Sequence, residues 1–371
     1  MVSNTDPDVA RLMAFVRRPY RMLGLDVLDP TWKISVLTLF SAFIFIMQQL
    51  AAVKFLVTHL DSFDIASECL ALSAIGCEIT LRMILLLYFR DMLRDTVDAV
   101  SNQNDLFRNS ESFKRLSKEF CQVAFRSVRA VGLIYSSTAT FQLIPIFFPD
   151  PRKNNLPLAF SLPFIPSDVA PYWHVNYVFD VFVNVMGILF MVGSDGMLIM
   201  CILAVVYQIK GLKQSLQELD TGAEPEHLRQ ELAYLVRTHM AIKRFMSQME
   251  QKYKFDLLIL FGLVSIVLCM GMNVIADNIC QPFTLFLTAA TFQLALLCFG
   301  GNLLLIESDS LADYMYSIDW SVMPVSEQKT LMVMIAHAQP PMAMNAIFMP
   351  LAMSSFISVM KASYSYYTIL H

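Results

Sequence analysis

Residues 298–320 read CFGGNLLLIESDSLADYMYSIDW, and residues 336–371 read AHAQPPMAMNAIFMPLAMSSFISVMKASYSYYTILH. In the first stretch, an apolar segment long enough to enter a membrane runs into a polar Glu-Ser-Asp-Ser segment. In the second, serines and tyrosines interrupt an apolar run that continues to the last residue of the sequence. Polar side chains within a membrane span usually face the bundle interior or water instead of lipid. The two stretches therefore predict a final helix that lines a pathway.

The whole chain has the composition of a membrane protein. Of its 371 residues, 56% are hydrophobic and only 16% are charged, and the mean hydropathy is +0.54. A helix needs about 20 mostly apolar residues to cross a membrane. The sequence offers such stretches at 34–57, 66–89, 127–148, 175–207, 255–276, 283–306 and 344–370. We therefore predict an all-α membrane protein with seven transmembrane helices.

The distribution of basic residues predicts the orientation. Most of the 27 lysines and arginines lie in the segments 1–33, 90–129 and 209–254, which face the same side of the membrane if there are seven spans. The positive-inside rule places these segments in the cytoplasm. The N-terminus is then cytoplasmic and the C-terminus extracellular, which is the reverse of the topology of a G-protein-coupled receptor.

Four regions follow from this topology. Residues 1–33 form a cytoplasmic N-terminal segment, and 34–208 hold the first four spans with a proline-rich outer loop at 149–172. Residues 209–342 hold a long fifth helix with a cytoplasmic stalk, the sixth helix and a short cytoplasmic helix, because apolar residues recur there at helical spacing. We expect the stalk helices to form a cytoplasmic anchor bundle. Residues 343–371 are expected to form the terminal pore-lining helix.

Patterns typical of enzymes and metal sites are absent from the sequence. It contains no zinc-protease motif, no nucleophile elbow and no phosphate-binding glycine loop. The seven cysteines do not have the spacing of metal ligands. We therefore expect neither an enzyme nor a cofactor, a metal or a nucleic-acid partner, and we expect membrane lipid around the chain.

Glu78 and Arg82 are opposite charges inside the second predicted span, four residues apart and so on the same face of a helix. A charge in the centre of a bilayer costs roughly 2.5 to 3.5 kcal/mol on the insertion scale. One interpretation is a buried ion pair that neutralises itself and faces the bundle interior. The other is a gating element.

Polar and aromatic side chains gather at one depth in the outer halves of spans two, three and four. Such a lining predicts a small, mostly apolar ligand pocket, although hydroxyl groups in membrane helices also mediate helix contacts. Asp180 could serve as a counter-ion for an amine or accept hydrogen bonds from its neighbours. The candidate ligand-binding residues are Ser73, Cys77, Ser137, Thr138, Phe141, Tyr177, Asp180, Val181 and Asn184.

The last predicted helix carries a stripe of small and polar residues that ends in a bulky apolar residue. An apolar residue at a constriction can close a pore by dewetting. The alternative interpretation is a packing seam between helices or subunits. The candidate pore and gate residues are Ser358, Ala362, Ser365 and Ile369.

In its C-terminal fifth the chain resembles the insect odorant receptors. The matching residues, in order, are Cys298-Phe-Gly-Gly-Asn-Leu-Leu, Glu307-Ser308, Met315-Tyr316, Asp319-Trp320, Ala338-Gln339-Pro340, Phe356 and Ala362-Ser-Tyr-Ser-Tyr-Tyr-Thr-Ile-Leu370. The resemblance implies a subunit of a tetrameric, non-selective cation channel that binds a small volatile odorant in the outer half of its helical bundle. Ile369 falls where the family has its hydrophobic gate.

The resemblance also implies a partner and a location. Odorant-binding subunits of this family assemble with a shared co-receptor in the plasma membrane of sensory neurons. The co-receptor has a much longer cytoplasmic loop before its fifth helix than the 209–254 connector here, so the chain resembles the odorant-binding subunit in a heterotetramer. Lys361 lies near the pore face, where a positive charge would oppose the passage of cations. A pore built from four copies of this chain would have four such lysines, so the residue also favours a heteromer.

Two other receptor classes are alternatives. A gustatory-type receptor channel has similar architecture, but its C-terminal pattern of Thr-Tyr followed by Gln-Phe is absent. A G-protein-coupled receptor requires the opposite distribution of basic residues and is disfavoured by the predicted topology.

Overall fold

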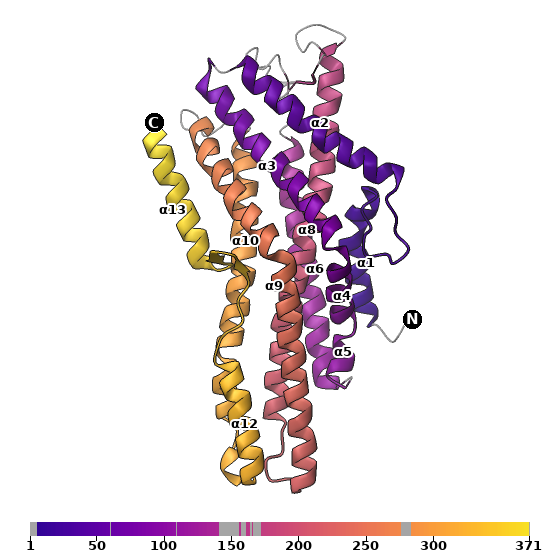
Figure 1. Ribbon diagram of the computed structural model, residues 1–371, viewed down its shortest axis with the longest axis vertical. Coiled ribbons are helices and arrows are strands. Elements are labelled where there is room, and N and C mark those ends of the chain that lie inside the picture. Colours follow the sequence, from indigo (N-terminus) through magenta and orange to yellow (C-terminus); the bar gives the residue numbers. More distant parts are fainter. Residues whose placement is uncertain are drawn as a thin grey trace.

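The computed structural model describes residues 6–59, 61–108, 110–140, 156, 161–163, 165, 172–275 and 283–370. Phe141 and most of the proline-rich loop at 149–172 lie outside the described residues. The described chain is almost entirely helical and elongated, with an upper bundle and a lower stalk (Figure 1).

In the part of the chain that the structure describes, the helices follow one another with one short hairpin before the last of them. In chain order they are α1 (Pro7–Met22), α2 (Val36–Thr58), α3 (Phe63–Tyr88), α4 (Arg90–Ser101), α5 (Gln103–Leu106), α6 (Glu111–Thr140), α8 (Tyr172–Gln217), α9 (Pro225–Ile275), α10 (Phe283–Asp309), α11 (Leu311–Tyr316), η3 (Trp320–Val322) and α12 (Val325–Ala338). They end with β1 (Asn345–Ala346), β2 (Met349–Pro350) and α13 (Met353–Leu370).

Among the described residues, five helical stretches are long and apolar enough to cross a membrane: α2, α3, α8, α9 and Phe283–Tyr316. α6 and α13 occupy the positions of the other two predicted spans. α6 packs along α8, and α13 packs along α9 and α10 on one side of the bundle (Figure 1). The predicted long fifth helix is present as α9, with 51 residues.

Local chemistry explains how the first two helices begin. Asp6 accepts a hydrogen bond from the backbone of Asp8 and is followed by proline at the first helical position, an arrangement that suits a helix N-terminus. Ser35 and Thr38 form a reciprocal capping box at the start of α2. α1 then lies against α8, where a Cβ on Gly193 would come within 3.2 Å of the Tyr20 ring. The small residue at 193 therefore allows the two helices to approach.

The start of the last helix differs from the prediction. A helix was expected from 343, but α13 begins at Met353, and residues 345–350 form an antiparallel hairpin. Pro350 lacks the backbone N–H that a helix interior needs, and Ile347 has a φ of 46°, which a helix cannot contain. Apolar composition alone does not distinguish a buried hairpin from a helix.

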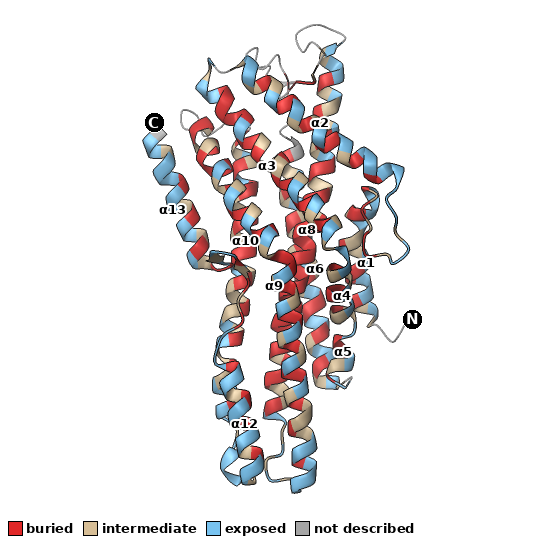
Figure 2. Cartoon of the chain, viewed as in Figure 1, coloured by how far each residue is buried: buried red, intermediate tan, exposed pale blue. Residues whose placement is uncertain are grey.

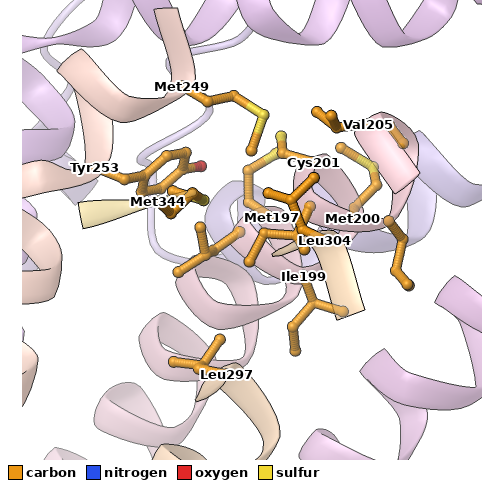
Figure 3. Packing of buried hydrophobic residues seen from close by; sticks show 14 of the residues in the cluster. Met197, Ile199, Met200, Cys201, Val205, Met249, Tyr253, Leu297, Leu304 and Met344 are labelled. Carbon is orange, nitrogen blue, oxygen red and sulfur yellow. The ribbon is translucent and has the colours of Figure 1, made fainter. Parts of the chain in front are cut away.

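The core joins three long helices to the segment before this hairpin. Met197, Met200 and Cys201 of α8 pack with side chains of α9 and α10 (Figure 3). Met344, which is fully buried, inserts into the same cluster near Tyr253 (Figure 3). Burial is concentrated in α8, whereas α12 and much of α13 are exposed in the single chain (Figure 2).

A cavity of about 220 Å³ separates α9 from α12 in the stalk and is lined by His239 and His337. His239 is buried, and its Nε2 atom has no hydrogen-bond partner among the described residues. Burial lowers the pKa of His239 to about 4, and the charges of Lys243 and His337 act in the same direction.

Acidification is therefore expected to loosen the stalk. The folded pKa of His239 is below its usual value, so the folded state favours the neutral ring. Its contribution to stability is complete above about pH 6.5 and is lost as the pH falls toward about 4. In detergent, the melting temperature should fall less between about pH 7.5 and about pH 5 for His239→Phe than for the wild type. His227→Phe, at an exposed position of α9, is the control; equal pH dependence of all three proteins would contradict this.

Candidate functional site

A cavity of about 90 Å³ lies between α3, α6, α8 and α10, with Gln48 of α2 at one wall. Its walls are mostly apolar, which suits a small apolar ligand. The apolar side chains include Ile75, Ile79, Val183, Ile188, Phe286 and Ala290. The polar side chains are Gln48, Tyr135, Thr138, Asn184 and Gln293.

Two of the predicted ligand-binding residues, Thr138 and Asn184, line this cavity. The hydroxyl group of Ser73 and the thiol of Cys77 instead donate to the Oε1 atom of Gln49, each at 3.3 Å. Ser137 donates to the carbonyl oxygen of its own helix at Ile134, at 2.6 Å.

The predicted residues at the start of α8 lie outside the cavity lining. Tyr177 stacks on Trp173 with ring centroids 5.2 Å apart. Asp180 is buried and Val181 is partly buried, and neither lines the cavity. Of the predicted ligand-binding residues that the structure describes, the cavity lining therefore contains Thr138 of α6 and Asn184 of α8.

Sequence reasoning missed Gln48 and Gln293. Both are amides within apolar spans, and both are buried. An isolated amide inside a membrane span normally faces the protein interior, because lipid cannot satisfy its hydrogen bonds. That signal was present in the sequence, although it does not say which helices meet.

Directly beside the cavity lies a buried charge cluster, which we define as Glu78, Arg82, Asp195, Lys252 and Asp256. Arg82 is its centre: its Nη1 atom is 3.0 Å from the Glu78 carboxylate and its Nη2 atom is 2.7 Å from that of Asp195. Its Nε atom is 3.9 Å from Asp256, which is an ion pair but too long for a hydrogen bond. Lys252 reaches Asp256 at 2.8 Å.

The buried charge cluster therefore extends the predicted Glu78–Arg82 pair to three helices. It contains three carboxyl groups and two basic groups from α3, α8 and α9. The Arg82 side chain is only 1% exposed. Removing Arg82 would leave buried carboxylates without a compensating charge, at a cost of roughly 3 to 5 kcal/mol.

Two cavity residues connect the cavity to the buried charge cluster. The Tyr135 hydroxyl donates to Oδ2 of Asp195 at 2.6 Å. The Gln293 amide donates from Nε2 to Oε1 of Glu78 at 3.1 Å. A molecule in the cavity therefore contacts side chains that are one hydrogen bond away from the charges.

The predicted stripe on the last helix faces away from the rest of the chain. Its members, Ser358, Ala362, Ser365 and Ile369, are all exposed, as is Lys361. On the opposite face, Ser363 is buried and donates to the carbonyl oxygen of Ser265 on α9 at 3.4 Å.

Comparisons with known proteins identify relatives of this chain. The profile of the family described as 7tm Odorant receptor matches residues 62–364. Odorant receptor 13a of Drosophila melanogaster is 25% identical over 255 residues, covering 62% of this chain and 60% of that protein. Odorant receptor 10 of Aedes albopictus is 25% identical over 250 residues, covering 65% of each chain. The matched regions thus span less than two thirds of these relatives.

A solved structure covers nearly the full length of the chain. The insect olfactory receptor OR5 from Machilis hrabei is 15% identical, and the comparison covers 98% of this chain and 99% of that one with a TM-score of 0.84. The comparison with the structure of that receptor in complex with eugenol gives a TM-score of 0.83. At this identity the likeness establishes the fold, and it confirms the predicted all-α membrane protein with seven transmembrane helices.

Proposed function

Because the chain belongs to the odorant receptor family, we propose that it is the odorant-binding subunit of a ligand-gated cation channel. A small, mostly apolar volatile molecule binds in the cavity, and binding opens a non-selective cation pore. The pore is formed with co-receptor subunits in a heterotetramer in the plasma membrane of a sensory cell. The family is one of receptors and not of enzymes, and the chain is a multi-pass membrane protein.

The cavity between α3, α6, α8 and α10 is the observation that carries this proposal. It has apolar walls for affinity and a few polar groups to orient a ligand. The same four-helix region contains the Tyr135 and Gln293 contacts to the buried charge cluster. A ligand that displaces either side chain changes the surroundings of a buried charge.

The geometry supports a route from the cavity to the last helix. Asp256 belongs both to the buried charge cluster and to α9, and α9 contacts α13 at Ser265. We propose that α13 lines the pore through Ser358, Ala362 and Ser365, with Ile369 as the gate. The exposure of this stripe in the single chain supports a role toward other subunits or water.

Exposed apolar residues on the stalk support assembly. Val325, Met332 and Val333 of α12 are exposed, as is Met240 of α9. Apolar surface of this kind marks a protein interface. We propose that residues 209–342 supply the cytoplasmic anchor between subunits, that 34–208 hold the odorant-binding bundle, and that 343–371 supply the pore.

The test is voltage clamp of cells that express this chain alone, a co-receptor alone, or both, during exposure to a panel of small volatiles. The proposal predicts an odorant-evoked inward current that requires both subunits and discriminates little among monovalent cations. A response from this chain alone would contradict the obligate partner. Silence in every combination, with the chain present at the cell surface, would contradict the channel function.

Filling the cavity should strongly reduce the sensitivity of the channel to odorants. Ala290 is buried and lines the cavity, so Ala290→Phe places a ring where the ligand would bind. We expect at least about a tenfold loss of odorant sensitivity, since even a methylene can change ligand discrimination that much. Ala295→Phe, on the same helix but outside the lining, should retain the response. Surface labelling separates lost binding from misfolding, and an unchanged response of surface-expressed Ala290→Phe would show that odorants bind elsewhere.

A further inference from the structure

We infer that the cavity selects small neutral molecules that donate a hydrogen bond, namely alcohols and phenols, over ketones and ethers of the same carbon skeleton. This inference rests on the proposed function, because it concerns the ligand class of the same cavity. It follows from how the two hydroxyl groups of the cavity have already committed their protons and from a buried amide oxygen without a partner among the described residues.

Two hydroxyl groups face the cavity, and each has a single proton that is already used. The Tyr135 hydroxyl donates to Asp195 at 2.6 Å. The Thr138 hydroxyl donates to the carbonyl oxygen of Tyr135 at 2.6 Å. Both groups retain acceptor lone pairs but have no proton left for a ligand. Toward the cavity they act as acceptors.

The two buried amides add further acceptors. Gln293 directs its amide nitrogen to Glu78 at 3.1 Å, and its carbonyl oxygen can only accept a hydrogen bond. Gln48 is 6% exposed, and its buried Oε1 atom also lacks a partner there. A buried acceptor without a partner is destabilising, and a hydroxyl donor in the cavity would satisfy it. Asn184 and the NH2 groups of the two glutamines also offer donors, so the preference rests on the two hydroxyl groups and on the Oε1 atom of Gln48.

The buried charge cluster strengthens this preference. A hydroxyl that donates to a carboxylate becomes a better acceptor, because hydrogen bonds in a chain polarise one another. Tyr135 is in this position beside Asp195. The buried charge cluster also has more carboxyl groups than basic groups. An ammonium ion would lose its hydration in an apolar cavity, so neutral hydroxyl compounds fit best.

The experiment compares linear, branched and cyclic alcohols and phenols, each with its ketone or methyl ether, on cells that express this chain with the co-receptor. The inference predicts that each effective skeleton is about threefold to tenfold more potent as the alcohol or phenol, which is the range of one hydrogen bond. Thr138→Val and Tyr135→Phe should each reduce that ratio. Thr291→Val, whose hydroxyl also bonds a helix carbonyl but lies outside the cavity lining, should keep it.

Ketones or ethers that match the alcohols in the wild type would overturn the inference, as would a panel in which no alcohol activates. A ratio unchanged in both Thr138→Val and Tyr135→Phe at normal surface expression would do the same. Ala290→Phe distinguishes the two levels. Suppose that the wild type shows no preference for alcohols. If Ala290→Phe then abolishes the responses, the proposed site stands and only the ligand class is wrong. If it leaves responses intact, the proposed site is wrong as well.

Discussion

Arg82→Met is expected to prevent the chain from reaching the cell surface. The substitution keeps most of the side-chain volume but removes the positive charge that lies within 3.0 Å of Glu78 and 2.7 Å of Asp195. Two carboxylates then remain buried without their main partner. A loss of about 3 to 5 kcal/mol follows from breaking a buried ion pair in this way. That loss is a large fraction of the stability of an ordinary domain.

Surface biotinylation and the melting temperature in detergent measure this effect. The control is Lys114→Met, which breaks an exposed pair with Glu111 and should cost at most about 1 kcal/mol. Arg82→Met combined with Asp195→Asn should recover part of the surface expression, because it removes one of the stranded charges. Wild-type melting behaviour of Arg82→Met would contradict the assigned role of the buried charge cluster.

Gly301→Ala is expected to prevent the last helix from packing against α10 and so to abolish the opening of the channel. A Cβ at this position would lie 2.0 Å from the backbone oxygen of Leu351, and real contacts of this kind are not shorter than 3.0 Å. Leu351 lies two residues before the start of α13, so the backbone that leads into the last helix must move away from α10. Overpacking in a core costs roughly 1 to 3 kcal/mol.

The neighbouring residue provides a matched control. A Cβ on Gly300 would lie 3.7 Å from Ile202, an ordinary van der Waals contact. Gly300→Ala should therefore give odorant-evoked currents similar to those of the wild type, while Gly301→Ala at equal surface expression gives little or none. Equal currents from the two variants would show that the contact between α10 and the start of α13 does not matter for gating.

Sequence reasoning found one pair of the buried charge cluster but not its other members. Glu78 and Arg82 are four residues apart, so helical geometry alone predicts that they meet. Asp195 and Asp256 join Arg82 from two other helices. Contacts between distant segments depend on how the helices pack, which periodicity in a single segment does not determine.

The candidate pocket shows the same limit. Thr138 and Asn184 were predicted from their polar character and depth, and they line the cavity. Gln48 comes from α2, outside the spans from which the pocket was predicted, and Gln293 comes from α10, the sixth span, for which no candidate residue was named. The seven-helix fold was predictable because hydropathy and the distribution of basic residues are properties of whole segments, which can be read from the sequence without knowing how the helices pack. The hairpin at 345–350 was not, because its apolar residues also suit a helix.

Locating a bound odorant by cryo-electron microscopy of this chain with its co-receptor tests the central claim most directly. An alcohol that activates the channel is the ligand to use. We predict density between α3, α6, α8 and α10, in contact with Thr138 and within hydrogen-bonding distance of Tyr135 or Gln48. Density only at the lipid-facing surface or between subunits, with this cavity empty, would contradict the account.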